Sequence, residues 1–433
     1  MLNAFASAFR TPDLRRKLLF TLGIIAVFRF GSVLPTPGVS YSAVQNCVNQ
    51  ANNGGIYGLI NLFSGGALLQ LSVFALGIMP YITSSIILQL LVVVIPRLEQ
   101  LKKEGQSGQA KITQYTRYLT VALAVLQATG LVAIARQPGR LLAGCSEDLI
   151  PNKSLTVTLS MILTMTAGTA VIMWLAELIT DRGIGNGMSL LIFTSIVSAV
   201  PGQFNSVLRS KGAFTLAAVI AIGIVIMAGI VFVEQAQRRI PVQYAKRQVG
   251  RRMYGGTSTY IPLKVNMAGV VPVIFASSLL YIPTLLVQLV GQNNTSGWKL
   301  FIQQNFTRGD HPLYMLTYAL LIIFFTYFYV AITFNPEEVA DNMKQYGGFI
   351  PGIRAGRPTA EYLDYVLTRI TLPGSVYLAT VAVIPIIGYA ALGVSDRFVF
   401  GGTSVLIMVG VGLETVKQIE AQLQQRNYEG FLR

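Results

Sequence analysis

The chain has 433 residues, of which 53% are hydrophobic and only 12% are charged, and its formal net charge is +15. A soluble protein would carry roughly twice that charged fraction, and uncharged runs of about 20 residues match membrane-spanning helices. Composition therefore excludes an ordinary soluble protein. A membrane β-barrel is excluded as well, because it would show alternating segments of about ten residues. We predict an all-α polytopic membrane protein.

Ten membrane-spanning helices are predicted in chain order. The basic N-terminus and the apolar run after it are typical of a signal peptide, but no small-residue cleavage site follows, so we expect a retained first helix. The fifth and tenth spans have weak boundaries. The predicted spans are residues 18–34, 72–95, 113–135, 156–180, 186–200, 213–233, 267–290, 313–334, 372–394 and 398–416.

Residues 59–95 form an uncharged segment that is too long for one span and too short for two. As one helix it would be roughly 55 Å long, whereas the hydrocarbon core of a membrane is about 30 Å thick. A pair of glycines lies near its start and Pro80 in its middle. We predict that residues 72–95 are the second span, with Pro80 inside it, and that residues 57–71 do not cross.

Most of the 33 lysines and arginines fall in the N-terminus, the even-numbered loops and the C-terminus. Because Lys and Arg concentrate on the cytoplasmic side of membrane proteins, both chain ends are predicted to be cytoplasmic. Ten spans with both ends inside divide into two sets of five, residues 1–200 and 201–433. The second set then runs opposite to the first, which is the layout of an inverted repeat. Hydropathy permits this division and does not prove it.

Two of the predicted cytoplasmic loops are long, residues 234–266 and 335–370. The first has seven basic residues and one acidic residue, and its flanks alternate around Gly255-Gly256. We therefore expect an extended hairpin there. Basic protruding loops either set the topology alone or also dock a partner, and both interpretations stay open.

Several residues and motifs that particular functions require are missing from the sequence, and their absence narrows the possible functions. No Asp or Glu lies near the centre of a predicted span, which weighs against an ion-coupled transporter. The sequence has no TVGYG-type filter, which weighs against a potassium channel. The sequence has no Gly-Lys dipeptide and hence no P-loop. The single histidine, His311, lies in a predicted external loop, so no intramembrane Ser-His pair is available. These absences favour a non-enzymatic channel or scaffold without a metal or cofactor.

Short motifs, distributed in order along the whole chain, carry a family resemblance. They are FSGGAL, FALGIMPYI, SIILQLL, KKEGQSGQ, ITQYTRY, DRGIGNGMSL, AQRRIPVQYAKRQVGRRMY, PLKVNMAGVVPVIFASS, TFNPEEVADNMK, FIPGIR and FGGTSVLI. As a set they are specific, and the chain resembles the SecY family, the pore subunits of the bacterial protein translocase. The resemblance implies a plasma-membrane channel that passes unfolded secretory chains and releases apolar segments sideways into lipid.

The resemblance also implies partners and a pore constriction. The family works with the small subunits SecE and SecG, with the SecA ATPase or a ribosome, and with signal sequences, nascent chains and lipids. Its constriction is a ring of branched apolar side chains, which can seal against ions by dewetting. The matching positions are Ile78, Ile82, Ile192, Ile274 and Ile407. Ordinary helix packing is the alternative explanation for any such isoleucine.

A plug is the next feature that the resemblance implies. Residues 57–71 match a short re-entrant helix that closes the pore beneath the ring, and they include Asn61, Phe63, Gly65 and Gly66. Each glycine costs helix stability of about 1 kcal/mol relative to alanine. A plug that must leave its seat is expected to be only weakly held.

The family's lateral gate opens between the second and third spans on one side and the seventh and eighth on the other. Its polar positions match Thr83, Gln127 and Asn266. Side chains of this kind hydrogen-bond across membrane helices, worth roughly 0.6–2 kcal/mol each. A static interhelical bond is the alternative explanation.

Family docking residues match Arg251 and Arg252 in the first long loop and Arg354 in the second. Arginine suits both carboxylates on a motor protein and phosphates on ribosomal RNA. Ala355 follows Arg354 where the family commonly has proline, so the loop tip is expected to be less rigid.

Cys47 and Cys145 fit no metal-binding spacing. Both lie in predicted external loops, where disulfides can persist, so the alternatives are two unpaired thiols or a bridge between them.

Two other functions compete with the channel. An inverted-repeat solute transporter shares the broken second segment, and a non-conducting assembly scaffold is the third class.

Overall fold

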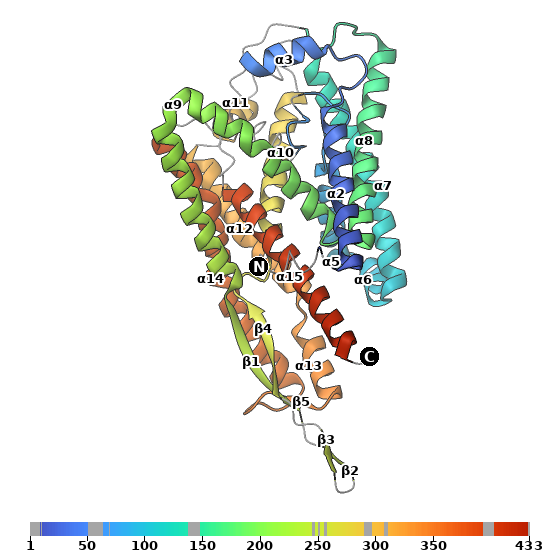
Figure 1. Cartoon of the computed structure of the whole chain (residues 1–433), viewed down its shortest axis with the longest axis vertical. Coiled ribbons are helices and arrows are strands. Elements are labelled where there is room, and N and C mark those ends of the chain that lie inside the picture. Colours follow the sequence, from blue (N-terminus) through green and yellow to red (C-terminus); the bar gives the residue numbers. More distant parts are fainter. Residues whose placement is uncertain are drawn as a thin grey trace.

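The computed structural model describes residues 9, 11–50, 64–68, 70–136, 148–244, 247–249, 252–254, 258–289, 297–306, 311–392 and 402–431. Figure 1 shows a bundle of long helices from which a narrow pair of strands protrudes at one end. The helices are α2 (Pro12–Val33), α3 (Tyr41–Gln50), α5 (Met79–Val94), α6 (Pro96–Lys103), α7 (Gln106–Ala135), α8 (Leu155–Arg182), α9 (Gly187–Gln235), α10 (Val271–Leu289), α11 (Gly297–Asn305), α12 (Pro312–Thr333), α13 (Pro336–Gln345), α14 (Arg357–Leu392) and α15 (Gly402–Phe431).

Helices occupy the ten predicted spans. In the described part of the chain, six helices are long and apolar enough to cross a membrane, or seven if the bent pair of α5 and α6 counts as one span. The fifth and sixth predicted spans are both parts of α9, whose backbone breaks at Gly212 with φ 85° and ψ 173°. The multi-pass helical class is confirmed, and the count of ten spans fits the helices without being tested directly.

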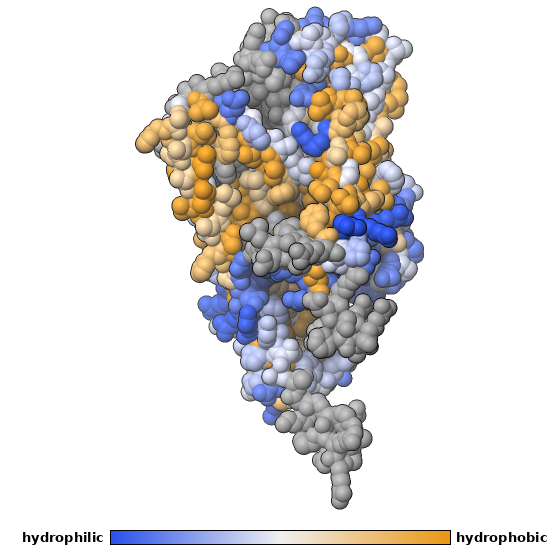
Figure 2. All heavy atoms as spheres, viewed as in Figure 1, coloured by the Kyte–Doolittle hydropathy of each residue, from blue (hydrophilic) through white to orange (hydrophobic). Residues whose placement is uncertain are grey.

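Hydrophobic side chains cover much of the helical bundle in Figure 2, and hydrophilic side chains gather toward the end that carries the strands. Large apolar side chains are strongly exposed on α9, where Phe214 is 89% and Phe232 is 78% exposed. Extended apolar surface of this kind marks contact with a membrane or a partner rather than with water. The distribution fits helices whose outer faces meet lipid.

The second span starts later than the sequence suggests. Pro80 was expected inside the helix, but α5 begins at Met79, and Pro80 occupies its first turn. A proline is tolerated there because the first N–H groups of a helix have no partner within it. Residues 70–78 form turns instead, and Ser72 makes an isolated β-bridge with Pro35. Pro80 therefore lies within the predicted span of residues 72–95, and the helical part of that span begins only at Met79.

The other end of this span is also set by a proline. α5 ends at Val94 and α6 begins at Pro96, with an angle of 100° between the two helices. The residue before a proline is disfavoured in the helical region, and Ile95 has an extended backbone with φ −101° and ψ 111°. α5 is thus a short helix of 16 residues bounded by a turn segment and a sharp bend.

The long basic loop forms the predicted hairpin. β1 (Gln237–Tyr244) pairs antiparallel with β4 (Ser258–Lys264), and β5 (Gly348–Phe349) joins the other edge of β1. β2 (Arg247–Val249) pairs with β3 (Arg252–Tyr254) farther out. The expected turn at 255–256 lies outside the described residues. In Figure 1, β1, β4 and β5 lie beside α13 at one end of the bundle, and β2 and β3 extend beyond them.

The hairpin is packed against the second long loop. Ile240 and Val242 of β1 are buried and share a hydrophobic cluster with Met343 of α13 and Leu363 of α14. The alternation of apolar and polar residues along β1 arises because one face of the hairpin covers a small hydrophobic core. The two loops form one structure beside the bundle.

Candidate functional site

The five isoleucines of the expected constriction are all buried. Ile78 caps the start of α5 and Ile82 lies in its first turns, while Ile192, Ile274 and Ile407 lie on α9, α10 and α15. Their exposed fractions are 2, 7, 3, 8 and 0% respectively. All five belong to one hydrophobic cluster, which draws helices from both predicted halves of the chain. Their role as a pore ring stays a prediction, because burial alone also fits ordinary packing.

The turn segment before α5, residues 70–78, packs against α2 and is hydrogen-bonded to the residues just after that helix. The backbone N–H and the hydroxyl of Thr36 both donate to the carbonyl oxygen of Leu71, at 3.1 and 2.7 Å. Phe74 stacks on Phe28 of α2, with ring centroids 6.0 Å apart. A Cβ atom at Gly31 would lie 2.2 Å from the Phe74 ring. This close approach explains why glycine occupies that turn of α2.

The expected plug is described only in its second part. Asn61 and Phe63 lie outside the described residues. Ser64 is helical, and Gly65 and Gly66 follow in a turn with φ +65° and +92°. Positive φ values of this size favour glycine. The two glycines therefore form a bend, as the sequence suggests, and their role in a plug remains a prediction.

The three expected gate residues do not bond to one another. Thr83 donates its hydroxyl to Met79 of its own helix at 2.9 Å, and Gln127 is half-buried on α7. Asn266, just before α10, donates its Nδ2 to Glu234 Oε1 at 2.6 Å. The described contacts of Thr83 are therefore within its own helix, and its role in a gate stays a prediction. Asn266 is instead tied to the end of α9 in its own half.

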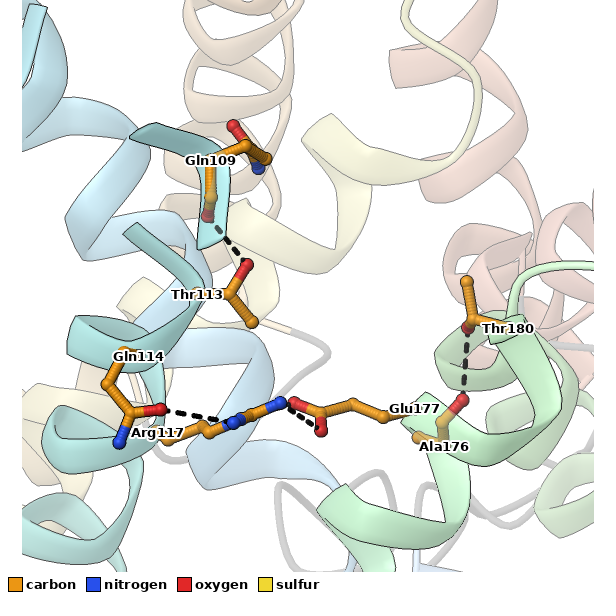
Figure 3. Close-up of polar contacts among 7 residues, drawn as sticks. All are labelled: Gln109, Thr113, Gln114, Arg117, Ala176, Glu177 and Thr180. Carbon is orange, nitrogen blue, oxygen red and sulfur yellow. Dashed lines mark hydrogen bonds and ion pairs between the residues drawn. The ribbon is translucent and has the colours of Figure 1, made fainter. Parts of the chain in front are cut away.

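The expected lateral gate is the seam where α5 and α7 face α10 and α12. Polar contacts that the sequence did not single out join helices on the α5 and α7 side of it. The hydroxyls of Ser84 on α5 and Thr120 on α7 are 2.9 Å apart, and both side chains are fully buried. Arg117 of α7 forms a bidentate ion pair with Glu177 of α8 (Figure 3). These contacts join α5, α7 and α8 into one unit. Each of the two apolar helices α7 and α8 carries a charged residue of opposite sign, and this feature of the sequence could have suggested the ion pair.

The other side of the seam has its own internal contacts. The Tyr318 hydroxyl of α12 lies 2.9 Å from Thr403 Oγ1 of α15, and both side chains are buried. Phe275 of α10 packs edge-on against Phe325 of α12, with ring centroids 5.7 Å apart. α10 also contacts α5 and α7. Among the described side chains, the hydrogen bonds and ion pairs that the structure gives do not join α5 or α7 to α10 or α12, and apolar contacts predominate in this part of the seam.

A cavity of about 430 Å³ opens at one end of the same seam. It lies between α5 and α7 on one side and α12 on the other, and Lys102 of α6 and Met188 of α9 also line it. Its lining includes Tyr81, Gln89, Gln109, Thr113, Met188 and Tyr329. Two of these residues, Gln109 and Thr113, lie on α7 ahead of Arg117 in the sequence (Figure 3). The seam is therefore hollow and partly polar at this end.

Of the expected docking arginines, Arg354 is described fully. It is exposed in the turn between β5 and α14. Its carbonyl oxygen accepts a hydrogen bond of 2.8 Å from the Thr359 hydroxyl, and the expected lower rigidity of the tip at Ala355 stays a prediction. Arg252 lies on β3, and Arg251 lies outside the described residues.

Cys47 of α3 is disulfide-bonded and fully buried. The chain has one other cysteine, Cys145, which lies outside the described residues. The alternative of two unpaired thiols is therefore wrong.

Long apolar helices with exposed apolar faces define the class of the protein: it is a multi-pass α-helical membrane protein. Comparison with known proteins then identifies its family. The SecY family model matches residues 72–416. The protein translocase subunit SecY of Streptomyces galbus is 67% identical over 440 residues, and that of Mycobacterium bovis is 61% identical over 442, each covering 100% of both chains. The chain belongs to the SecY family.

Solved structures show the same fold. A structure described as that of a protein conducting channel has a TM-score of 0.64 at 18% identity, covering 94% of this chain and 91% of the other. Sec61 in the canine ribosome-channel complex has a TM-score of 0.60 at 17% identity, with the same coverage. The helical arrangement is therefore shared with these channels.

Proposed function

We propose that the protein is a protein-conducting channel subunit that passes unfolded secretory polypeptides across the plasma membrane and releases transmembrane segments laterally into lipid. The observation that supports this proposal is that Ile78, Ile82, Ile192, Ile274 and Ile407 are all buried and belong to one extended hydrophobic cluster. These side chains come from helices of both halves, residues 1–200 and 201–433, so separating the halves would part them. The family membership and the shared fold support the same function.

An apolar constriction suits a substrate of variable sequence. Polar filters recognise one ion or solute, whereas a ring of aliphatic side chains offers no specific partner and can exclude ions by dewetting. Isoleucine has no hydrogen-bonding group, so the ring can deform around any passing side chain. The chemistry requires no bond to be made or broken, and the proposal therefore includes no catalytic residue and no cofactor.

The lateral gate is proposed at the seam of α5 and α7 with α10 and α12. Apolar packing can part without leaving buried polar groups unpaired, whereas broken hydrogen bonds in lipid would be expensive. The polar cavity at one end of the seam gives a signal sequence a place to enter. Thr83, Gln127 and Asn266 are proposed to tune how readily the seam opens.

Partners are proposed from the family and from charge. SecE and SecG are the expected small subunits, and the SecA ATPase or a ribosome is the expected cytoplasmic partner, with docking at Arg251, Arg252 and Arg354. One structural neighbour is Sec61 in a ribosome-channel complex, and another is a yeast Ssh1 complex bound to the 80S ribosome. Both termini and the two long basic loops are proposed to be cytoplasmic.

Reconstitution tests the proposed function against the competing solute transporter. The protein, assembled with its small subunits, is placed in vesicles with SecA, ATP and an unfolded secretory precursor. We expect the precursor to become protected from external protease. Absence of protection together with uptake of a small solute would contradict the channel and favour the transporter.

A further inference from the structure

Arg29 is a charged residue within the first span that the proposed function leaves unused. It lies on α2, one turn from the end of the helix, and is half-buried. Its Nη1 donates a hydrogen bond of 3.0 Å to the carbonyl oxygen of Gly65. Among the described residues, no carboxylate forms an ion pair with it. Charged groups at membrane depth are rare and require a specific reason.

Gly65 lies in a narrow slot between Arg29 and α9. A Cβ atom at this position would lie 2.8 Å from Arg29 Nη1 and 3.2 Å from the Cα atom of Ser195. Ser195 itself is 1% exposed. The positive φ of +65° turns the Gly65 carbonyl within reach of the guanidinium. Glycine suits this backbone angle, and a side chain here would displace the Arg29 guanidinium or crowd Ser195.

Gly66 is different from its neighbour. Its φ is +92°, but a Cβ atom there would meet nothing within 4 Å. On its far side, Thr36 and Phe28 fasten Leu71 and Phe74 to α2. The segment is thus held at Gly65 by Arg29, at Ala67 and Leu68 by burial in the bundle, and at residues 71–74 by contacts with α2 and the residues just after it.

We propose that the Arg29 guanidinium is a latch that holds Gly65 against α9 and so keeps the start of this turn segment seated in the closed channel. The proposal rests on the proposed channel function and adds a positioning residue to it. A charge-assisted hydrogen bond is roughly twice as strong as a neutral one. It is a single directional contact at the start of the segment, ahead of the buried Ala67 and Leu68, so its loss is expected to free the start of the segment first.

The latch is tested by the ion conductance of resting channels in planar bilayers, measured per assembled channel. Arg29→Gln removes the charged donor and is expected to raise resting conductance roughly tenfold, the scale of one such bond. Arg29→Lys keeps a charged donor and should give a smaller rise. Arg136→Gln is the matched control, because Arg136 also donates to a backbone carbonyl, that of Lys153, and it should leave conductance unchanged.

A second variant tests the same slot without changing Arg29. Ser195→Leu places a larger side chain where Gly65 now fits, and the same leak is expected if the seat matters. Unchanged conductance in both Arg29→Gln and Ser195→Leu would overturn the proposal, as would an equal rise in Arg29→Lys or Arg136→Gln. Translocation by the unmodified channel, measured in parallel, separates a failed latch from a failed channel function.

Discussion

Arg117 of α7 and Glu177 of α8 face one another across two membrane helices and form two parallel hydrogen bonds. Nε lies 2.9 Å from Oε1 and Nη2 lies 2.7 Å from Oε2. A third bond of 3.0 Å joins Arg117 Nη1 to Gln114 Oε1 (Figure 3). The pair links α7 to α8, so we expect that an opening movement at the seam would carry both helices together.

Breaking this pair is expected to destabilise the folded protein. In Glu177→Gln the arginine loses its charged partner, and the free energy of unfolding should fall by about 1–3 kcal/mol. Glu99→Gln is the matched control, because Glu99 and Lys103 form an exposed pair at 2.7 Å that should contribute less than about 1 kcal/mol. Thermal unfolding in detergent measures both, and equal losses would argue against a special role for the α7–α8 pair.

Polar substitution in the isoleucine cluster is expected to open the resting channel to ions. Serine at Ile78, Ile82 or Ile192 introduces a hydroxyl that holds water in a constriction that would otherwise dewet. Planar-bilayer recordings should show leak in all three variants. Ile322 on α12 is equally buried in the same cluster, and Ile322→Ser should lower stability without leak. Leak from Ile322→Ser alone would contradict the assignment of the ring.

Apolar substitution at the gate residues is expected to have unequal effects. Asn266→Leu leaves the Glu234 carboxylate without its 2.6 Å donor and should loosen the seventh-span side, so signal sequences of lower hydrophobicity should be accepted. Thr83→Val removes a bond within one helix only and should shift the threshold less. A graded series of signal sequences measures the threshold, and an unchanged threshold in Asn266→Leu would exclude it from the gate.

Charge reversal at Arg354 is expected to weaken docking of a cytoplasmic motor. Arg354→Glu should lower motor-driven translocation several-fold, since a bidentate contact with a carboxylate becomes repulsive. Assembly of the channel in the membrane should be unaffected, because the side chain is exposed. Arg357→Glu serves as the positional control, since Arg357 is also exposed and lies three residues away, where it pairs with Glu361. Undiminished translocation with Arg354→Glu would remove this residue from the docking surface.

Deletion separates the turn segment from the span after it. Removing residues 60–68 should leave a folded but leakier channel, because the attachment at residues 71–74 is retained. Removing residues 78–86 deletes the first half of α5 and should prevent accumulation of the protein. Membrane fractionation and conductance measure both outcomes, and a tight channel without residues 60–68 would contradict the plug.

Most of the helical architecture could be predicted from the sequence, because hydrophobic runs of membrane length depend on the chain alone. The hairpin was likewise visible in the alternation around Ile240 and Val242. The start of α5 was not, since a proline in an apolar run fits either a helix interior or a first turn. Distinguishing them required the contacts of residues 70–78 with α2.

The polar contacts of the site could not be predicted, because they join residues far apart in the sequence. Arg117 and Glu177 are separated by 60 positions, and Arg29 and Gly65 by 36. The Thr83 hydroxyl donates one turn back in its own helix, which is the common outcome for helical threonine. The isoleucines were placed by resemblance, and the structure adds that all five are buried in one extended hydrophobic cluster.

Crosslinking of a stalled secretory chain tests the central claim most directly. Photoreactive probes at Ile82, Ile192 and Ile274 face the proposed path, and a probe at Phe214, which is 89% exposed on α9, faces away from it. The account predicts crosslinks to the stalled chain from the three isoleucine positions and none from Phe214. Crosslinks absent from all three, or no stronger than from Phe214, would contradict a polypeptide path through the cluster.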